Sequence, residues 1–473
     1  MSSLAPRALV GRMRRALAAA PPVAVLALGW LVLIVYAFPG QMTRDSYSHL
    51  REARSGIYTD GHPPVINLIW KLVDAVVEGP FGMLVLQSTM LLAGMFFVFR
   101  HMLGPRRAAW LAVAVFLYPP VFAPMAVIWK DCLMAGFLSL GIASLLSKRR
   151  WSHLTGLAAL FGATAVRYNA LAATLPLVVL LFQWRPGARG LRRYAIALAS
   201  WLVLTVAAFR LNAALTDRPM HFWYSSLAVH DIVGTHAQLD EDLPDAQLAA
   251  RLAGTELLVE RDIHRNMRAV YDPSNFFPIL SDPERPLWRL PIIGTEPAPR
   301  AQRDAIGRAW WATVTEHPFA YLVHRLRVFA TVLSFGDPTP PGAVTPREAP
   351  AWTALATELG TTHEASELQR GMTRALVAFS KRVPVFVPWI YFALSVLCAP
   401  LAFRQRDVLA VLLSGLSFQG GLLFLAPSPD YRYSHWMVSC TVVGLAVLAT
   451  RRYRHARPAA NTKHAVASQA SAQ

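Results

Sequence analysis

The composition of the chain sets it apart from ordinary soluble enzymes. Of its 473 residues, 54% are hydrophobic and only 16% are charged, and the net charge is +18. A chain this apolar is expected to have the lipid bilayer as its main solvent. The basic excess does not predict nucleic-acid binding, because it lies in short clusters between apolar runs, whereas segment 215–383 carries 20 acidic and 17 basic residues.

Apolar segments close to the length of a spanning helix, about 20 residues, recur from Pro21 to Leu448. The first is interpreted as a span and not as a cleaved signal peptide. We predict ten spans, at 22–39, 82–100, 108–127, 131–147, 153–166, 169–184, 194–213, 384–403, 407–426 and 434–450. The fifth and sixth are short, which requires a locally thin bilayer or packing behind other helices.

Loop charge predicts the topology. If the Arg-rich N-terminus is cytoplasmic, alternation also places the basic loops 100–107, 147–153, 184–193 and 404–406 in the cytoplasm. The sequence therefore predicts a multi-pass protein of a bacterial inner membrane, with both termini cytoplasmic and membrane lipids around it. The run 319–335 is apolar but interrupted by His324, Arg325 and Arg327, so we expect an interfacial helix there.

The predicted fold is all-α, with four parts. Residues 1–214 form a transmembrane core whose first outer loop carries the candidate site. Residues 215–383 form a periplasmic segment that is rich in proline and partly helical, for example over 245–267. Residues 384–450 form the last spans, and 451–473 a basic cytoplasmic tail. The three cysteines show no metal-type spacing; no cofactor is predicted, and the use of a divalent metal is left open.

Polar residues gather at the predicted outer ends of the spans. They occur in the segments Thr43–Tyr47, Asp60–Pro64, Trp129–Asp131, Arg167–Asn169 and Pro429–Tyr433. Such groups are costly beside a membrane unless they are useful. Carboxylates and cations on one face suit a reaction between a lipid-anchored phosphate compound and a water-exposed acceptor, in which a carboxylate takes the acceptor proton.

Some of these residues also form a recognisable pattern. Asp45 after the first span, Pro63-Pro64 later in the same loop and the late Tyr431-Arg432-Tyr433 resemble the GT-C superfamily of membrane glycosyltransferases, which includes protein O-mannosyltransferases and aminoarabinose transferases. The segment from Trp310 to Arg325 resembles a juxtamembrane stretch of bacterial members. The resemblance implies transfer of a sugar from a polyprenyl-phosphate donor to a glycan, lipid or protein acceptor on the outer face.

The same resemblance implies individual roles. Asp45 would be the catalytic base, Lys130, Arg167 and Arg432 would hold the donor phosphate, and His62 would shape the substrate pocket. The predicted substrate-binding residues are Asp60, His62, Lys130, Asp131, Arg167, Tyr431 and Arg432. Ser46 departs from the pattern, because many relatives carry a second acid at that position.

Plainer interpretations and other functions remain open. Asp45 would also suit a helix cap, Asp60 a turn, Lys130 with Asp131 an interfacial ion pair, and Arg167 a side chain reaching from a helix end to the surface. A ligase or polymerase of envelope glycans would use Arg and His of the large outer segment. A transporter of a lipid-linked substrate would be expected to carry internal repeats and mid-bilayer ionisable residues, which the sequence does not display.

Overall fold

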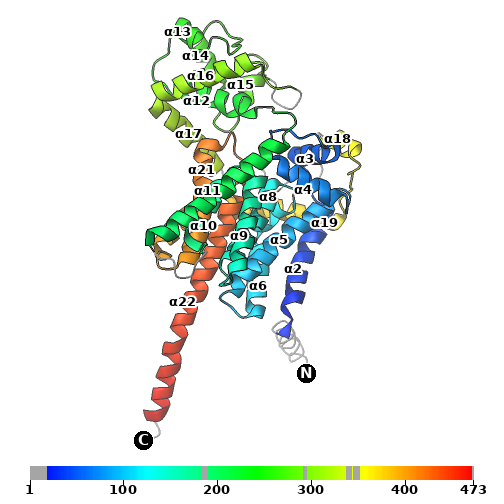
Figure 1. Ribbon diagram of the computed structural model, residues 1–473, viewed down its shortest axis with the longest axis vertical. Helices are drawn as coiled ribbons and strands as arrows, with labels where there is room; N and C mark the ends of the chain where they lie inside the picture. The colour runs from blue at the N-terminus through cyan, green and yellow to red at the C-terminus, as the bar shows by residue number, and fades with distance from the viewer. Residues whose placement is uncertain (1–18, 184–189, 291–295, 337–343, 345–351, 471–473) are drawn as a thin grey trace.

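The protein is described by a computed structural model that covers residues 19–183, 190–290, 296–336, 344 and 352–470, with side chains as far as residue 452. The described residues form helices and turns, and their β-structure is limited to isolated bridges, such as the one between Gln41 and Val127. Figure 1 shows a long body of helices with a smaller helical group at one end. The predicted all-α fold is confirmed for the described residues.

Nine of the predicted spans each coincide with one helix. These helices are α2 (Pro22–Ala37), α5 (Phe81–Arg100), α8 (Lys130–Leu145), α9 (Arg150–Val166), α10 (Ala170–Leu181), α11 (Gly190–Leu215), α20 (Pro388–Leu401), α21 (Arg406–Leu425) and α22 (His435–Ala470). By length and composition, four described segments can cross a membrane: α5, α11, α21 and Tyr431–Arg452. The chain is thus a multi-pass membrane protein, and the total of ten spans stays a prediction.

The segment predicted as a span at 108–127 is not one continuous helix. It consists of α6 (Pro105–Phe116) and α7 (Pro119–Met125), which meet at an angle of 73°. The break falls at Leu117 and Tyr118, just before Pro119 and Pro120, which lack the backbone N–H groups that a continued α6 would need and instead begin α7. Counted as one broken span, this pair brings the number of candidate spans to five.

The helical group at the end of the molecule lies within the large predicted outer segment. It comprises η1 (Tyr224–Ala228), α12 (Val229–Ala237), α13 (Asp245–Arg251), α14 (Ile263–Val270), α15 (Pro278–Ser281) and α16 (Arg300–Glu316). These helices bury a core of their own, which includes Trp288. The stretch 245–267, predicted to be helical, is helical at both ends, and left-handed backbone at Gly254 and Glu256 lies between α13 and α14.

Three further helices connect this group to the body. Helix α17 (Pro318–Val332) follows α16 directly and covers the run in which an interfacial helix was predicted, while α18 (Thr353–Glu358) and α19 (Glu367–Arg382) lead back to the last spans. The predicted first outer loop contains two short helices, α3 (Arg44–Ser55) and α4 (Pro64–Asp74). In Figure 1, α3, α4 and α18 lie together at the end of the body that also carries the helical group.

Helix α8 lies in the centre of the body and fixes one part of the site. Its neighbours approach through small residues: a Cβ atom on Gly94 of α5 would lie 2.5 Å from the Cβ of Ser139, and one on Gly136 of α8 would lie 2.8 Å from the Cβ of Met90. Close contact through small residues is typical of helices packed in membranes. Because Lys130 is the first residue of α8, this packing also determines where Lys130 lies.

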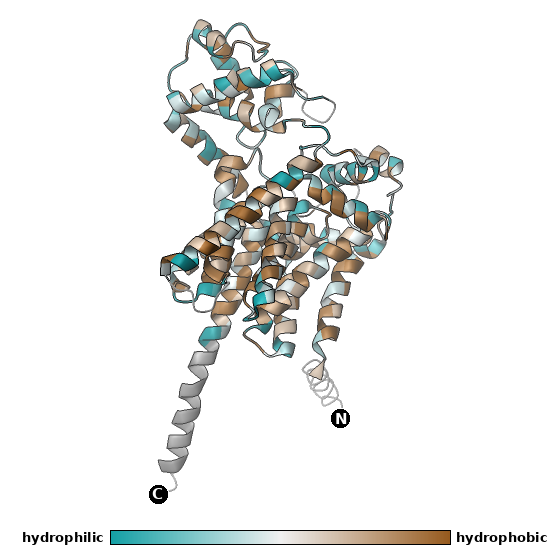
Figure 2. Ribbon diagram, viewed as in Figure 1, coloured by the Kyte–Doolittle hydropathy of each residue, from teal (hydrophilic) through white to brown (hydrophobic). Residues whose placement is uncertain are grey.

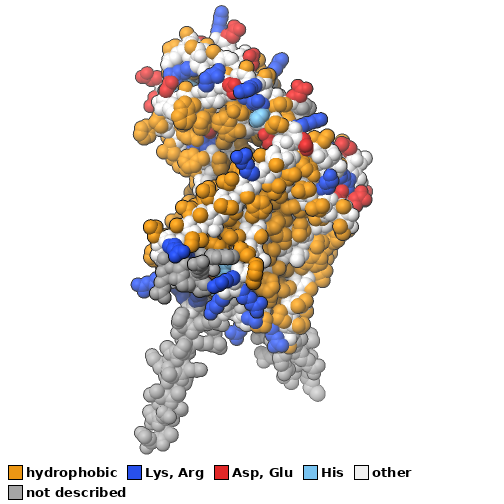
Figure 3. All heavy atoms as spheres, in the orientation of Figure 1, with side chains coloured by type: hydrophobic (Ala, Val, Ile, Leu, Met, Phe, Trp, Pro, Cys, Tyr) orange, Lys and Arg blue, Asp and Glu red, His pale blue; other side chains and the backbone are white. Residues whose placement is uncertain are grey.

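The surface has apolar and charged zones of the kind expected for a membrane protein. Figure 2 shows mainly hydrophobic helices through the body and mixed ones in the end group. On the face seen in Figure 3, Lys and Arg gather at the end where α22 leaves the body, whereas both signs of charge cover the opposite group. Positive charge at one end is what the predicted topology requires; which end faces the cytoplasm stays a prediction.

Candidate functional site

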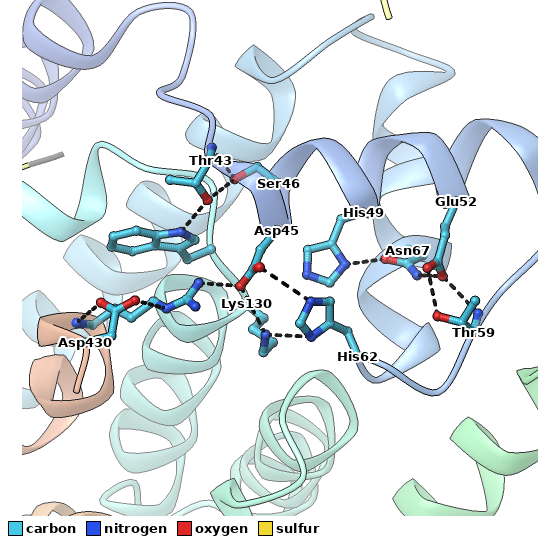
Figure 4. A network of polar contacts seen from close by, with 12 residues as sticks. Thr43, Asp45, Ser46, His49, Glu52, Thr59, His62, Asn67, Lys130 and Asp430 are labelled. Atoms are coloured by element: carbon cyan, nitrogen blue, oxygen red, sulfur yellow. Dashed lines mark hydrogen bonds and ion pairs between the residues drawn. The ribbon is translucent and has the colours of Figure 1, made fainter. Parts of the chain in front are cut away.

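Asp45 lies in the first turn of α3, but it is not the residue that caps this helix. Thr43 is the N-cap, and its backbone N–H donates to the Ser46 hydroxyl at 3.1 Å. The Ser46 hydroxyl in turn donates to the carbonyl of Ile128 at 2.8 Å, and the Trp129 indole N–H donates to the Thr43 hydroxyl at 2.9 Å. These contacts join the start of α3 to the residues just before α8 (Figure 4).

The same contacts explain why position 46 is a serine and not an acid. Its side chain is fully buried and donates to a carbonyl oxygen. A carboxylate at this position has no proton to donate and would face that carbonyl oxygen unpaired, which is costly in a buried place. A second acid at position 46, which the GT-C pattern would place there, therefore does not fit the packing found here.

The carboxylate of Asp45 is surrounded by cationic or basic side chains from three other segments. Its Oδ2 accepts a hydrogen bond from Nη1 of Arg432 at 2.6 Å and lies 3.9 Å from Nζ of Lys130, and its Oδ1 lies 3.8 Å from Nε2 of His62 (Figure 4). Burial raises the pKa of Asp45, but Arg432, His62 and Lys130 outweigh it and hold the pKa well below the usual range. Asp45 is thus an ionised carboxylate, and 24% of its side chain remains exposed.

The orientation of His62 follows from its neighbours. The Lys130 ammonium has only donors, and it lies 3.0 Å from Nδ1 of His62. Nδ1 is therefore the acceptor, and in the neutral ring the proton sits on Nε2, which faces Asp45. Burial and Lys130 lower the pKa of His62, an effect that Asp45 partly offsets. The ring is neutral at pH 7 and leaves the positive charge at the carboxylate to Lys130 and Arg432.

His49, one helical turn after Asp45, supports His62 from the side. The two rings lie 4.6 Å apart between centroids, and Nδ1 of His49 lies 2.6 Å from the Asn67 amide oxygen. The Asn67 amide donates to Glu52, which also accepts from Thr59. This chain of contacts, visible in Figure 4, joins α3 to α4 and fixes the His62 ring.

Arg432 is held by a second carboxylate and by two aromatic rings. Its Nε lies 2.9 Å from Oδ2 of Asp430, and its guanidinium carbon lies 5.1 Å from the Trp129 ring and 5.4 Å from the Tyr433 ring. Cation–π contacts of this kind hold a guanidinium in place while leaving its remaining N–H groups free to bind an anion. Burial raises the pKa of Asp430, which Arg432 partly offsets.

A second ion pair lies at the start of α8. Asp131 and Arg167 are 2.6 Å apart between Oδ1 and Nη1, and their side chains are only 1% and 8% exposed. The Arg167 guanidinium carbon also lies 5.1 Å from the Tyr433 ring, on which Arg432 packs as well. Tyr433 thus links the two arginines into one cationic region, and Arg167 is buried instead of reaching out to the surface.

The structure separates two of the predicted site residues from this cluster. The Asp60 carboxylate accepts from the backbone N–H groups of Met220 and His221, at 2.5 and 3.1 Å, and so ties the first outer loop to the segment after α11. Tyr431 is buried, and its hydroxyl donates to the carbonyl of Pro120 at 3.1 Å. Among the predicted residues, Asp45, His62, Lys130 and Arg432 share one cluster, and Asp131 with Arg167 lies beside it.

Several residues of this region were not predicted individually. His49 carried no signal in the sequence, whereas Asp430 and Tyr433 flank Arg432 in the segment already noted. In the predicted outer segment, Asp231 of α12 is buried and lies 3.1 Å from His324 and 3.2 Å from Arg325. His324 and Arg325 are thus buried in an ionic network of the fold.

The residues define a class of protein: an all-helical, multi-pass membrane protein with a carboxylate held among cations at one end of the helical body. The described residues contain no group of three or more His, Cys, Asp or Glu side chains placed to hold a metal ion.

Comparison with known proteins gives only distant similarity. No protein-family model and no curated protein matches the chain. Among solved structures, the crystal structure of ArnT from Cupriavidus metallidurans bound to undecaprenyl phosphate matches with 17% identity and a TM-score of 0.34, over 89% of this chain and 77% of that one. The apo structure of the same protein matches with 15% identity and a TM-score of 0.33, over 89% and 76%. Similarity at this level is too low to support a conclusion about fold or activity.

Proposed function

We propose that the protein transfers a sugar from a polyprenyl-phosphate donor to an acceptor on the outer face of a bacterial inner membrane, as a glycosyltransferase of the GT-C type. Asp45 is the general base, and Arg432 and Lys130 bind the donor phosphate. The observation that supports this most is the ionised Asp45 carboxylate in contact with Arg432 and close to Lys130 and His62. The GT-C resemblance of the sequence supports the same assignment.

In the proposed reaction, the acceptor oxygen attacks the anomeric carbon of the donor sugar. Asp45 takes the acceptor proton as the new C–O bond forms, and the bond from the anomeric carbon to the phosphate oxygen breaks. The electron pair of that bond leaves with the polyprenyl phosphate, which is a stable anion and needs no acid. A single displacement of this kind inverts the anomeric configuration.

The contact between Arg432 and Asp45 has a consequence for this mechanism. A carboxylate that accepts a short hydrogen bond from a guanidinium is a weak base. When a donor phosphate binds, Arg432 and Lys130 gain a second anion to contact, which weakens their hold on Asp45 and raises its basicity. We infer that the base becomes active only when the donor is present.

The large predicted outer segment offers less support for an envelope-glycan ligase or polymerase. Such an enzyme would use Arg and His of this segment to bind a pyrophosphate-linked donor. Arg325 instead donates to Asp231 and to the carbonyls of Leu423 and Ala426, and His324 contacts Asp231 in the same buried network. The polar groups of these side chains already contact other parts of the protein, so they are not available to bind a donor.

The direct test is transfer of radiolabelled sugar from polyprenyl-phosphate donors in membranes that contain the wild type, Asp45→Asn or Asp304→Asn, at matched protein levels. Asp304 is an exposed acid of α16 and serves as the control. We expect donor-dependent labelling in the wild type and the control, and a loss of about 100-fold or more in Asp45→Asn. Equal labelling in all three would remove Asp45 from the mechanism, and absence of labelling with every donor would contradict the function.

A further inference from the structure

Helix α19 carries an unusual charge for its place in the molecule. It contains one acid, Glu367, and four basic residues, which are Arg370, Arg374, Lys381 and Arg382. On the face seen in Figure 3, Lys and Arg gather at the end where α22 leaves the body, which is opposite to the candidate site. A strongly basic helix at the end that carries the site departs from this distribution and needs an explanation of its own.

The start of α19 lies at the apolar rim of the body. The Gln369 amide nitrogen donates to the carbonyls of Val35, at 3.2 Å, and Phe38, at 2.9 Å, at the end of α2 that leads into α3. Val35 and Phe38 are themselves 47% and 42% exposed. Because exposed apolar side chains at the end of a predicted span are expected to face lipid, α19 begins where this lipid-facing surface ends.

The other end of α19 reaches the same rim at a different span. The helix is followed by η3 (Pro384–Phe386), and the Phe386 ring lies 5.6 Å from the ring of Tyr431, one residue before Arg432. The predicted span α20 comes next, and its Trp389 is 38% exposed. Both ends of α19 thus lie at the level of the candidate site, so the helix runs across this end of the body and not along the spans.

The two sides of α19 differ in chemistry. Met372, Leu376 and Phe379 pack against the apolar clusters of the body. At about 100° per residue, Arg374 and Lys381 lie within about 20° of each other and on the opposite side of the helix. Both are exposed, and neither forms an ion pair with a residue that the structure describes. These two cations therefore contribute nothing to holding α19 on the body.

We propose that the basic side of α19, defined by Arg374 and Lys381, binds the phosphate groups of anionic phospholipids in the leaflet next to the candidate site. Basic residues beside a span attract anionic head groups, and the helix follows the rim at which such head groups lie. A protein partner would also need an apolar contact area, and the apolar side of α19 is covered by the body. The proposal is independent of the proposed transferase function, because lipid contact needs neither a donor nor transfer.

The test places a reporter on α19 itself, since basic loops at the other end of the body would also attract anionic lipids. In the full chain with its three cysteines replaced by serine, Ala378→Cys carries a fluorophore at an exposed position of α19. Nanodiscs contain phosphatidylglycerol or phosphatidylcholine, at equal mole fraction, with the same spin label near the top of the acyl chain. Quenching by phosphatidylglycerol should exceed quenching by phosphatidylcholine about twofold or more at about 0.1 M salt, and the difference should shrink at about 1 M.

Two double variants separate the basic side of α19 from charge in general. Arg374→Gln with Lys381→Gln should bring quenching by the two lipids to the same level. The control, Arg265→Gln with Arg308→Gln, removes the same charge from exposed positions of the helical group and should keep the difference. Thermal unfolding should be the same in all three proteins, because the four substituted side chains are exposed.

Equal quenching by both lipids in the labelled parent protein would overturn the proposal. Absence of quenching by either lipid would also overturn it, and would show that α19 lies clear of the bilayer, as binding of an acidic protein or glycan would require. A preference for phosphatidylglycerol that survives Arg374→Gln with Lys381→Gln would overturn the assignment to these two side chains.

Discussion

The guanidinium of Arg432 donates a 2.6 Å hydrogen bond to the carboxylate of Asp45, although 387 positions separate the two residues in the chain. Asp45 belongs to the predicted first outer loop, and Arg432 lies in the turn before the last helix. Their contact brings the candidate base and the candidate phosphate-binding group together before any substrate is present.

This contact predicts how substitutions combine. Arg432→Lys should lower transfer about 100-fold, mainly through a higher KM for the donor, because lysine provides neither the guanidinium fork nor its stacking on Trp129 and Tyr433. The double variant Asp45→Asn with Arg432→Gln should be about as slow as the slower single variant, since both residues serve one step. Initial rates across a donor series would test this, and fully multiplicative losses would contradict it.

The lowered pKa of Asp45 predicts the acid side of the pH profile. A base with a depressed pKa stays ionised as the pH falls, so kcat/KM for the donor, which reports the free enzyme, should stay level from about pH 7 down to about pH 4, the ordinary carboxyl range. Arg432→Gln removes a cation that lowers this pKa, so its acid limb should move to higher pH by about one unit or more. An acid limb at the same pH in both proteins would show that Asp45 is not the titrating group.

The free energy of unfolding should also fall at acid pH. The depressed pKa of Asp45 stabilises the fold above its unfolded-state pKa, about 3.9, and this contribution is lost as the pH falls through the folded-state pKa. Thermal unfolding at each pH of the assay separates the loss of fold from the loss of the base.

Asp60 should behave differently from Asp45. Its carboxylate accepts from the N–H groups of Met220 and His221, so Asp60→Ala should lower the free energy of unfolding by about 1–3 kcal/mol. It should retain most of the transfer activity that Asp45→Asn loses. Thermal melts in detergent, read alongside the transfer assay, would test this, and an inactive Asp60→Ala protein of normal stability would return Asp60 to the substrate site.

Arg325 should be a residue of structural importance. It lies in the buried network with Asp231 and donates to the last carbonyls of α21, only a few residues before Asp430. Arg325→Met leaves Asp231 with one fewer cation in a buried site and should lower the free energy of unfolding by about 3–5 kcal/mol. The control is Arg327→Met, an exposed position on the same helix. Urea unfolding of both variants would test the difference, and equal midpoints would contradict it.

The predicted topology can be tested by labelling. In a protein whose three cysteines are replaced by serine, single cysteines at positions 107, 148 and 404 should react only with reagents that reach the cytoplasm. Cysteines at positions 59 and 274 should react from the outside. Labelling of positions 59 and 148 from the same side would contradict the placement of the site on the outer face.

The sequence by itself determined where the helices lie and which of their ends carry polar groups. Hydropathy is a local property of each segment, so nine predicted spans coincide with single helices. The remaining one, 108–127, is broken just before Pro119-Pro120, because proline lacks the N–H that a continuous helix needs and hydropathy does not report this. Only the tertiary structure decided which polar groups contact one another. Asp45 pairs with Arg432, and Asp131 pairs with Arg167. Asp60 accepts hydrogen bonds from two backbone N–H groups. His324 and Arg325 are buried beside Asp231. An ion pair between distant segments depends on how helices pack, and no single segment carries that information.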